Sequence, residues 1–520
     1  MRKFTLVLSA MLLPALLFGP EIAKGYVYED LNGNQRKDRK EKGIEGVAVS
    51  DGCNVVTTDK DGYYELPVSE KCVVFVVKPK GYAFAVNDKW QPQSYYIHKP
   101  TGSPDFKYKG SAPTGKMPKQ LNFGMKKVDD PENFKFFVFG DPQPYNMKQM
   151  EYFRTGIVAE AKKMEGVTFG ISMGDLVGDN LDLQPAYLNA VSEMQLPWYN
   201  VIGNHDRNYD ATDDKFSNET FEKNFGPSNY AFRYGDVHFI VLDDIILSNP
   251  PKGNPYRGGL REDQLQFVEN YMKLVSKDQL VVLAYHIPLV YNSNFDAGQR
   301  SRLLNALAGH KVFAMSAHTH VQMQNFYGSE IGWNGVEPFY EYNVGTTCGD
   351  WYSGIVGSNG QPDATMRDGT PRGYAIVTVT GNDYLVDYKV LGKPADKQMT
   401  IYSPKVLPYK QDGRFFFYVN FYMGKSDDRV EYRIDGGEWK KLAVANEVDP
   451  TYMNNVYLWD NTEKYLEGER PGSVPRLSTH LWKGRLDQSV APGEHRIEVR
   501  ATDLYGRTFT DFSTFRCIEK

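Results

Sequence analysis

Side chains that bind divalent cations stand at the ends of five apolar runs in the middle of the chain. Carboxylates, imidazoles and carboxamide oxygens are ligands for such cations in proteins. The carboxyl ends of parallel strands share one edge of a sheet, and ligands bind along that edge. If the five runs are strands of such a sheet, residues far apart in sequence converge there. In chain order the five ends carry Asp141 with Gln143, Asp175, Asn204 with His205 and Asp206, His286, and His318 with His320.

This ordered set predicts a two-metal site for a phosphate ester. One Gly-Asp or one His after a strand is commonly a turn or a satisfied polar group, but five such ends in order favour a shared site. Two cations ~3.5–4 Å apart hold a phosphate and activate a water. Such a pair needs a bridging carboxylate, and Asp175 is the natural candidate. Two divalent ions, the carboxylates of Asp141 and Asp175 and one hydroxide sum to roughly +1, which suits an anionic ester. This charge does not separate a monoester from a diester.

The pattern around these residues is that of an α/β domain. Nearly continuous apolar runs alternate with amphipathic stretches at 147–164, 262–277 and 300–307. Strands alternating with helices in this way predict an α/β fold class. The expected strands lie at 134–139, 167–173, 198–202, 237–242, 280–285 and 312–315.

The two ends of the chain show a different pattern from the middle. Short β-branched runs separated by Gly and Asp predict a small β-sandwich before the charged linker at 126–133, and helical periodicity stops again near 394. The prediction is therefore an α/β domain flanked by two small β-sandwich domains. Its parts are a signal peptide at 1–24, an N-terminal β-sandwich at 25–125, a catalytic domain at 131–340, a connection with pocket loops at 341–393, and a C-terminal β-sandwich at 394–520.

A known family shares this series of motifs. Over roughly 134–325 the chain resembles the calcineurin-like metallophosphoesterases, and the whole chain resembles a bacterial subgroup with dedicated β-domains on both sides. The resemblance implies a four-layer α/β/β/α sandwich and hydrolysis of a phosphate mono- or diester by a metal-bridging hydroxide. The motifs that carry it are Gly140-Asp141-Pro142-Gln143, Gly174-Asp175, Gly203-Asn204-His205-Asp206, His286 and His318-Thr319-His320.

The resemblance also implies a role for each residue. His205 would be the general acid that gives a proton to the leaving alkoxide. Asp206 or Asp179 would orient His205; the sequence does not separate the two, and Asp206 is included among the predicted catalytic residues. One metal would be held by Asp141, Gln143, Asp175 and His320, and the other by Asp175, Asn204, His286 and His318.

Two positions depart from the family pattern. Gln143 stands where the family usually has His, and an amide oxygen is a harder and weaker ligand than imidazole. We therefore expect a weakly held first metal that favours Mn, Mg or Fe over Zn. Ala317 stands where Gly is usual, and we expect the turn to form with it.

The segment after the last histidines is rich in turns and aromatic residues. Because it follows the predicted ligands directly, Trp351, Tyr352 and Arg372 are predicted to shape a substrate pocket. The competing interpretation is a packed connection into the last domain.

A possible second cation site lies near the start of the chain. A twelve-residue stretch has oxygen ligands at places one, three, five, nine and twelve of a calcium loop, but Gln35 stands where glycine is expected. A solvated charged turn is the alternative to bound calcium. The five ligands would be Asp30, Asn32, Asn34, Asp38 and Glu41.

The N-terminus and the composition bear on location and partners. A basic head at 1–3 and an apolar run at 4–18 predict a secretory signal, and hence a periplasmic, cell-surface or secreted protein; a retained anchor or a buried helix is the alternative. No later segment reaches the ~20 apolar residues of a membrane span. A net charge of −5 without a basic run argues against nucleic acid as a partner.

Two further alternatives stay open. Cys53 and Cys72 either pair in the oxidising environment of an exported protein or remain free thiols. The main competing function is a non-catalytic surface protein that binds a glycan or another partner with the same fold. An enzyme whose ester belongs to a glycan or a lipid is a third hypothesis, because export would bring it near such substrates.

Overall fold

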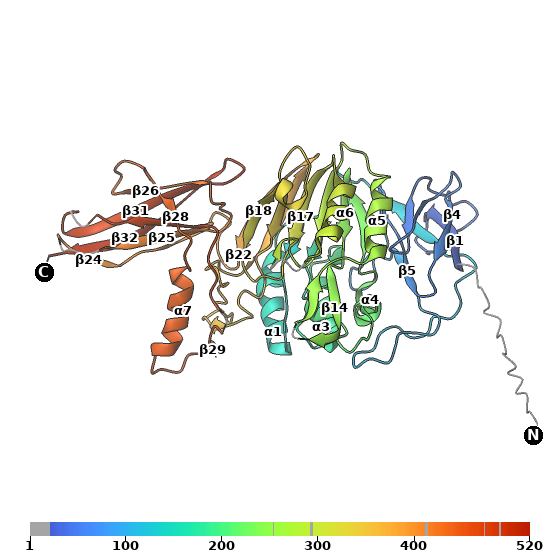
Figure 1. Cartoon of the computed structure of the whole chain (residues 1–520), viewed down its shortest axis with the longest axis horizontal. Coiled ribbons are helices and arrows are strands. Elements are labelled where there is room, and N and C mark those ends of the chain that lie inside the picture. Colours follow the sequence, from blue (N-terminus) through green and yellow to red (C-terminus); the bar gives the residue numbers. More distant parts are fainter. Residues whose placement is uncertain are drawn as a thin grey trace, which may run out of the picture.

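The computed structural model describes residues 21–252, 254–291, 295–410, 414–472, 474–487 and 490–519. The chain forms an elongated row, with a β-domain at each end and an α/β domain between them (Figure 1). Most of the predicted signal peptide lies outside the described residues. Its predicted boundary at residue 24 falls inside strand β1 (Glu21–Glu29), which pairs from Glu21 with β4 (Tyr63–Val68), and Ala23 is fully buried.

The N-terminal domain is a sandwich of two four-stranded sheets, in the orders β4-β1-β8-β6 and β3-β2-β5-β7. Val27, Leu66 and Val74 are among the apolar side chains that fill the space between them. Alternate residues of a strand face opposite sides, so one face of each sheet supplies this core. Its remaining strands are β2 (Ala48–Ser50), β3 (Val55–Thr57), β5 (Cys72–Val76), β6 (Tyr82–Phe84), β7 (Tyr95–His98) and β8 (Phe123–Lys127).

The middle domain contains two sheets packed face to face. One has the order β11-β10-β9-β21-β22 and the other β12-β13-β16-β17-β19-β18. Phe136 and Phe169 of the first sheet pack against Phe239 of the second, with ring centroids 5.4 and 5.3 Å apart. The strands that carry the predicted site are β9 (Asn133–Phe139), β10 (Phe169–Ser172), β11 (Trp198–Asn200), β16 (Leu280–Ala284) and β17 (Lys311–Ser316). The other strands of the six-stranded sheet are β12 (Tyr230–Tyr234), β13 (Val237–Val241), β18 (Met323–Tyr327) and β19 (Phe339–Asn343), and a separate hairpin is formed by β14 (Ile245–Lys252) and β15 (Asn254–Gly258).

Helices cover the outer face of each sheet. Phe153 and Tyr187 pack on the five-stranded sheet, while Phe267 and Leu303 pack on the six-stranded sheet. The layers are therefore helix, sheet, sheet and helix, which confirms the four-layer α/β/β/α sandwich. The helices are α1 (Met147–Tyr152), which continues through a π-helical turn at Phe153–Val158 into α2 (Ala159–Ala161), then α3 (Gln184–Ser192), α4 (Glu219–Phe225), α5 (Glu262–Met272) and α6 (Ala297–Leu307).

Part of the expected connection at 341–393 belongs to the catalytic sheets. Strand β21 (Gly373–Thr380) pairs with β9 and with β22 (Asp383–Val390), and so completes the five-stranded sheet. The first five residues of β21 are all buried, as in a strand covered on both faces. Only the loops at 344–372 remain as the connection that passes the predicted site.

The C-terminal domain is a second sandwich. Its sheets have the orders β23-β25-β30-β28 and β24-β32-β31-β26-β27, with Phe417, Trp482 and Val499 in the core between them. The expectation that no helix follows 394 is wrong, because α7 (Pro450–Asn461) forms there. The Asp449 carboxylate accepts hydrogen bonds from Thr451 N and Tyr452 N and so begins this helix. A separate two-stranded sheet joins β20 (Gly354–Ile355) of the 344–372 connection to β29 (Gly468–Glu469). The strands of the sandwich are β23 (Met399–Tyr402), β24 (Val406–Pro408), β25 (Phe416–Phe421), β26 (Arg429–Ile434), β27 (Lys440–Lys441), β28 (Ala443–Val444), β30 (Leu481–Arg485), β31 (Gly493–Thr502) and β32 (Thr508–Ile518).

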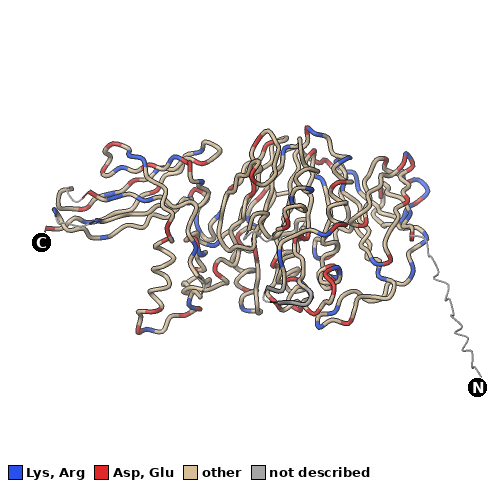
Figure 2. The backbone as a smooth tube through the Cα atoms, in the orientation of Figure 1, with Lys and Arg blue, Asp and Glu red and all other residues tan. Residues whose placement is uncertain are grey.

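Residues of both charge signs are interspersed along the chain in all three domains (Figure 2). Within the described ranges, no helix has the length and apolar character needed to cross a membrane. Cys53 and Cys72 are free thiols in the structure and do not form the disulfide that was one of the two alternatives for this pair.

Candidate metal centre

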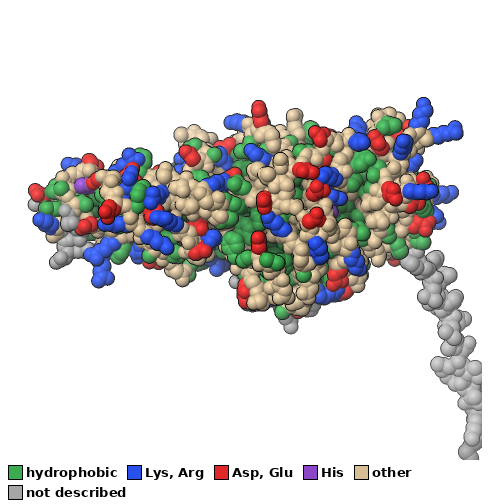
Figure 3. All heavy atoms as spheres, turned by 90° about the horizontal axis from the view of Figure 1, so that it is seen from above, with side chains coloured by type: hydrophobic (Ala, Val, Ile, Leu, Met, Phe, Trp, Pro, Cys, Tyr) green, Lys and Arg blue, Asp and Glu red, His purple; other side chains and the backbone are tan. Residues whose placement is uncertain are grey.

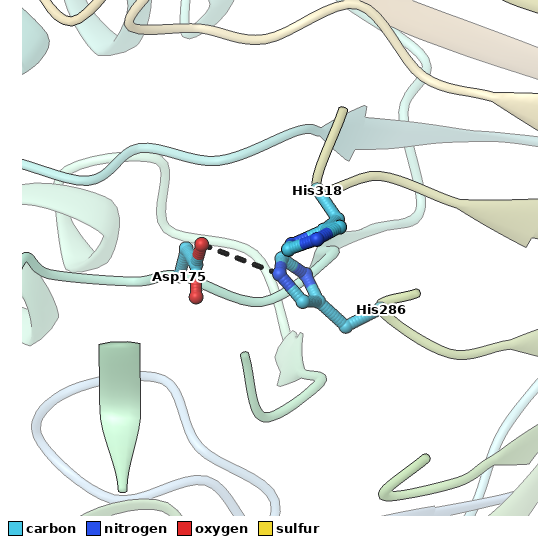
Figure 4. A group of neighbouring side chains, drawn as sticks. All are labelled: Asp175, His286 and His318. Atoms are coloured by element: carbon cyan, nitrogen blue, oxygen red, sulfur yellow. Dashed lines mark ion pairs between the residues drawn. The ribbon is translucent and has the colours of Figure 1, made fainter. Parts of the chain in front are cut away.

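Loops at the carboxyl ends of β10, β16 and β17 bring three predicted ligands together. One ligand atom each of Asp175, His286 and His318 lies within 4.8 Å of the others. The Asp175 Oδ2 atom is 3.2 Å from His286 Nε2, and the two side chains point toward each other in Figure 4. The ligands converge as the sequence predicts, but the prediction of a single sheet edge is corrected, because β10 belongs to the five-stranded sheet and β16 and β17 belong to the six-stranded sheet.

Further predicted ligands surround this group. Asn204 Oδ1 lies 3.2 Å from His286 Nε2, and Asp141 Oδ1 lies 3.6 Å from His286 Nδ1. The backbone of the loops ties the set together, because Gln143 N donates to the Asp175 carbonyl over 2.8 Å and His318 N donates to Asp141 Oδ2 over 3.0 Å. Six of the predicted ligands are thus joined by direct contacts, and His320 follows His318 by two residues in the same loop.

The ligand loops have an unusual backbone. Residues other than glycine seldom adopt a positive φ, and such conformations gather at functional sites. In a tight turn after a strand, a positive φ lets side chains two apart reach the same point instead of following the strand. Here φ is +32° at Asp141, +38° at Gln143, +49° at Asp175, +70° at His318 and +52° at His320.

Two buried oxygens show that the residues fit a cation. Asp141 Oδ1 and Gln143 Oε1 are buried and have no hydrogen-bond partner among the described residues. Gln143 Nε2 lies 3.3 Å from the Tyr145 hydroxyl and donates to it, which leaves the carbonyl oxygen of Gln143 for another partner. A buried acceptor without a partner is costly, and a bound cation would satisfy both oxygens.

The electrostatics of the carboxylates agree with this. Burial raises the pKa of Asp141 to about 8. Burial also acts to raise the pKa of Asp175, but the imidazoles of His286, His205 and His318 together outweigh it and the pKa is lowered. A divalent cation favours the ionised form of a carboxylate. Bound cations would therefore stabilise two buried, charged carboxylates, which burial alone disfavours.

Two of the three ligand imidazoles are neutral, whereas the carboxylates of Asp175 and Asp141 outweigh burial and raise the pKa of His286 to about 10. Burial lowers the pKa of His318 and of His320 to about 3, so both rings are neutral, the form that binds metals. His286 Nδ1 is 2.8 Å from the Met173 carbonyl, which leaves Nε2 to face Asp175. His320 Nδ1 is 2.9 Å from the Gly349 carbonyl, so Nε2 is its ligand atom.

His205 stands beside the centre with a carboxylate partner. Its Nδ1 lies 2.7 Å from Asp179 Oδ1, and its backbone N donates to Asp175 Oδ1 over 2.9 Å. Burial acts to lower the pKa of His205, but the carboxylates of Asp175 and Asp179 outweigh it and raise this pKa to about 9. Of the two candidates for orienting His205, the structure places Asp179 in contact with it.

The prediction of Asp206 as a catalytic residue is corrected. The tight turn at 204–206 directs its carboxylate back into the loop backbone, where it accepts hydrogen bonds from Gly203 N at 2.9 Å and Leu176 N at 3.1 Å. Asp206 is fully buried and holds two ligand loops together instead of facing the His205 ring.

Of the three predicted pocket residues, only Trp351 reaches the centre. Its ring stacks on His320, with centroids 3.9 Å apart and planes at 18°. Tyr352 is buried behind the site, where its hydroxyl donates to the Pro142 carbonyl. Arg372 is buried too, 5.6 Å from the Tyr352 ring, and donates to Gln361 Oε1 over 2.6 Å. Tyr352 and Arg372 support the loop that carries Asp141 and do not line a pocket.

Four residues around the centre escaped the sequence analysis. The Tyr145 ring lies 5.9 Å from that of His205, while Tyr291 and Tyr256 lie 5.3 and 6.2 Å from His318. Arg367 donates to the Thr319 carbonyl. Tyr256 belongs to strand β15, and the other three lie in loops of irregular spacing. The aromatic content of 14% is the one sequence signal that bears on the three tyrosines, and none bears on Arg367.

A hollow lies away from the metal centre, near the amino end of strand β17. Seen from above in Figure 3, hydrophobic side chains gather between the catalytic and C-terminal domains, where Phe326, Tyr340 and Tyr384 line a hollow of about 490 Å³. Lys311, the first residue of β17, also lines it, whereas His318 follows the last residue of that strand. The hollow therefore does not open onto the metal centre.

The predicted calcium loop folds around its own polar groups. Asp30 accepts hydrogen bonds from Gly33 N and Gln35 N, and Glu41 accepts one from Leu31 N. The amides of Asn32 and Asn34 donate to Asp38 Oδ2 over 2.8 and 3.0 Å. The five predicted ligands are thus neighbours, and bound calcium stays a prediction.

Comparison with known proteins places the chain in a family. Three family models match in chain order: the N terminal of calcineurin-like phosphoesterase at residues 30–111, calcineurin-like phosphoesterase at 134–322 and the C terminal of calcineurin-like phosphoesterase at 341–509. No curated protein matches significantly. One similar solved structure is a purple acid phosphatase from seeds of yellow lupin, Lupinus luteus, with 13% identity, 71% of each chain covered and a TM-score of 0.36.

The fold and the ligand set together define a metal-dependent phosphoesterase. The chain belongs to the calcineurin-like phosphoesterases, in the form that carries dedicated N- and C-terminal domains.

Proposed function

We propose that this protein is an exported hydrolase that cleaves a phosphate mono- or diester at two divalent cations, with His205 as the general acid. The observation that carries the proposal is the meeting of Asp175, His286 and His318 beside the His205–Asp179 pair. A purely structural metal site would not need an imidazole held at hydrogen-bond distance by its own carboxylate next to the ligands.

Each residue has a defined task in this proposal. When bound, two divalent cations would neutralise phosphate charge and lower the pKa of a water molecule. His205 Nε2 would give a proton to the leaving oxygen, while Asp179 accepts a hydrogen bond from Nδ1 and so fixes the tautomer. Asp141, Gln143, Asp175 and His320 would hold one cation, and Asp175, Asn204, His286 and His318 the other.

The experiment that tests the proposal is hydrolysis of a chromogenic phosphomonoester and of its diester analogue with added Mn²⁺. We expect turnover that is lost after chelation and restored by metal. The preferred ester then sets the substrate class. If the metal-loaded protein turned over neither ester nor any larger phosphate ester, the non-catalytic binding protein would become the better interpretation.

Export is the second part of the proposal. Its support is the basic head and the apolar run of the first 18 residues, together with the start of β1 at Glu21. We expect mass spectrometry of protein recovered from outside the cytoplasm of the native cell to find an N-terminus that lies after the apolar run and no later than Glu21. Mature protein that begins at Met1 and stays in the cytoplasm would contradict export.

The amide ligand gives a prediction about metal choice. Because Gln143 offers a neutral oxygen, Mn²⁺, Mg²⁺ or Fe²⁺ should support activity better than Zn²⁺, and Gln143→His should move both metal content and activity toward Zn²⁺ by about tenfold. Metal analysis and activity after reconstitution with each ion measure this shift. Gln120→His adds an imidazole at an exposed position of the N-terminal domain and is the control. An unchanged preference in Gln143→His would show that Gln143 does not choose the metal.

A further inference from the structure

Arg367 lies beside the metal centre, on the side of His318 and His320. Its Nη2 atom donates to the carbonyl of Thr319, the residue between the two histidines, over 2.8 Å. The guanidinium carbon also lies 5.8 Å from the Trp351 ring, which in turn stacks on His320 at 3.9 Å. Arg367 is therefore held one ring away from a predicted metal ligand.

The carbonyl and the indole fix the guanidinium without using most of its donors. An arginine has five N–H groups in a planar fork, and Thr319 takes one of them. Nε is buried and has no hydrogen-bond partner among the described residues. The remaining donors of this side chain are available for a bidentate partner.

A second arginine, Arg476, lies close to Arg367 in the folded chain. Burial first, and then the charge of Arg476, lower the pKa of Arg367. Arg476 is exposed, and its backbone N donates to the Arg367 carbonyl over 3.0 Å. The nearby carboxylate is Asp350, which is buried and also accepts hydrogen bonds from Ser353 and Tyr452. Arg367 is thus near the charges of Arg476 and of the buried Asp350, whose carboxylate also has the partners Ser353 and Tyr452.

We propose that Arg367, assisted by Arg476, binds a second phosphate of the substrate while the first occupies the metal centre. This inference rests on the proposed function and narrows its substrate class to esters with two phosphate groups. Arginine matches phosphate geometry through paired N–H donors, which a single metal-bound phosphate on a neutral alcohol would not engage. The second phosphate would belong either to a diphosphate linkage or to a separate position of a bisphosphate.

The test compares substrates with one and two phosphates. The value of kcat/KM is measured for 4-nitrophenyl phosphate, a nucleoside diphosphate and a sugar bisphosphate, in the wild type, Arg367→Gln and Arg367→Lys. We expect Arg367→Gln to lower the ratio of the better two-phosphate substrate to 4-nitrophenyl phosphate at least tenfold. Arg367→Lys should retain part of it, because it keeps the charge and loses the fork. The two-phosphate substrate with the higher kcat/KM shows whether the second phosphate belongs to a diphosphate linkage or to a separate position of a bisphosphate.

Controls separate this role from a structural one. Arg516→Gln removes an exposed arginine of β32, on the C-terminal domain, and should leave the ratio unchanged. Metal content and melting temperature of each variant are measured alongside. If Arg367→Gln lowered kcat/KM for all substrates by one factor, Arg367 would support the fold of the site only, and the proposal would be overturned.

A binding experiment keeps this inference distinct from the proposed hydrolysis. Inorganic phosphate and pyrophosphate are titrated into the metal-loaded protein by calorimetry, with the metal in excess over pyrophosphate. We expect pyrophosphate to bind at least tenfold more tightly than phosphate in the wild type, and this advantage to disappear in Arg367→Gln. That result would stand even if no ester were cleaved, whereas equal affinities in the wild type would end the inference although hydrolysis were observed.

Discussion

Asp175→Asn is expected to remove metal-dependent activity, with a loss in kcat/KM of at least about 10³-fold. The carboxylate of Asp175 is the one shared by both predicted ligand sets, and it contacts His286 at 3.2 Å and the backbone N of His205 at 2.9 Å. An amide keeps the shape of this group and loses its charge. The positive charge of two cations would then be opposed by the carboxylate of Asp141 alone.

Metal content and heat stability measure this effect independently of turnover. A cation that binds the folded protein raises its melting temperature by mass action. We expect the wild type to gain stability with Mn²⁺ and Asp175→Asn to gain little. Asp182→Asn makes the same chemical change at an exposed carboxylate seven residues further on and serves as the control. A variant Asp175→Asn that kept both its metal and its Mn²⁺-dependent stabilisation would show that the centre does not depend on this residue.

His205→Ala is expected to lower kcat by about 10²- to 10⁴-fold while metal content stays that of the wild type. The loss should depend on the leaving group. A nitrophenolate leaves readily without a proton, whereas an alkoxide needs one, so an alkyl phosphate should lose more than 4-nitrophenyl phosphate. His495→Ala is the matched control, because His495 also has a carboxylate, that of Asp435, 2.6 Å from Nδ1, but lies on the C-terminal domain. An equal loss for both leaving groups would contradict a general acid.

The partner of His205 makes a related prediction about pH. The acid must be protonated to act, and the carboxylates of Asp175 and Asp179 hold its pKa high, at about 9 without metal. Bound cations repel the imidazolium and lower its pKa. In the pH–rate profile of the metal-loaded enzyme, the alkaline limb, where kcat falls as His205 loses its proton, therefore lies below pH 9. Asp179→Asn removes one of the carboxylates that raise this pKa, and the alkaline limb should move to lower pH.

Asp206→Asn should instead lower the melting temperature, since Asp206 accepts backbone hydrogen bonds in the ligand loops. An alkaline limb that moved in Asp206→Asn and not in Asp179→Asn would reverse this assignment.

The ligands of the centre were readable from the sequence because each belongs to a short motif that ends a strand. A buried strand followed by Gly-Asp or by His-Thr-His carries its chemistry locally, and parallel pairing brings the strand ends within each sheet to one edge. The meeting of the edges of two different sheets was decided by how the sheets pack face to face. The order of apolar runs and helices likewise determined the α/β class, and alternating runs determined the two β-domains.

Other features depended on contacts between residues far apart in the chain. The choice of Asp179 over Asp206 followed from the direction of one tight turn. The burial of Tyr352 and Arg372 followed from the packing of the 344–372 loops, and the assignment of β21 to the catalytic domain followed from its pairing with β9. Residue type and spacing determined which groups could bind a metal. Only the tertiary structure decided which residues orient His205, which predicted pocket residues are buried and which strands complete the sheets. These features depend on segments that are far apart in the sequence and meet only in the folded chain.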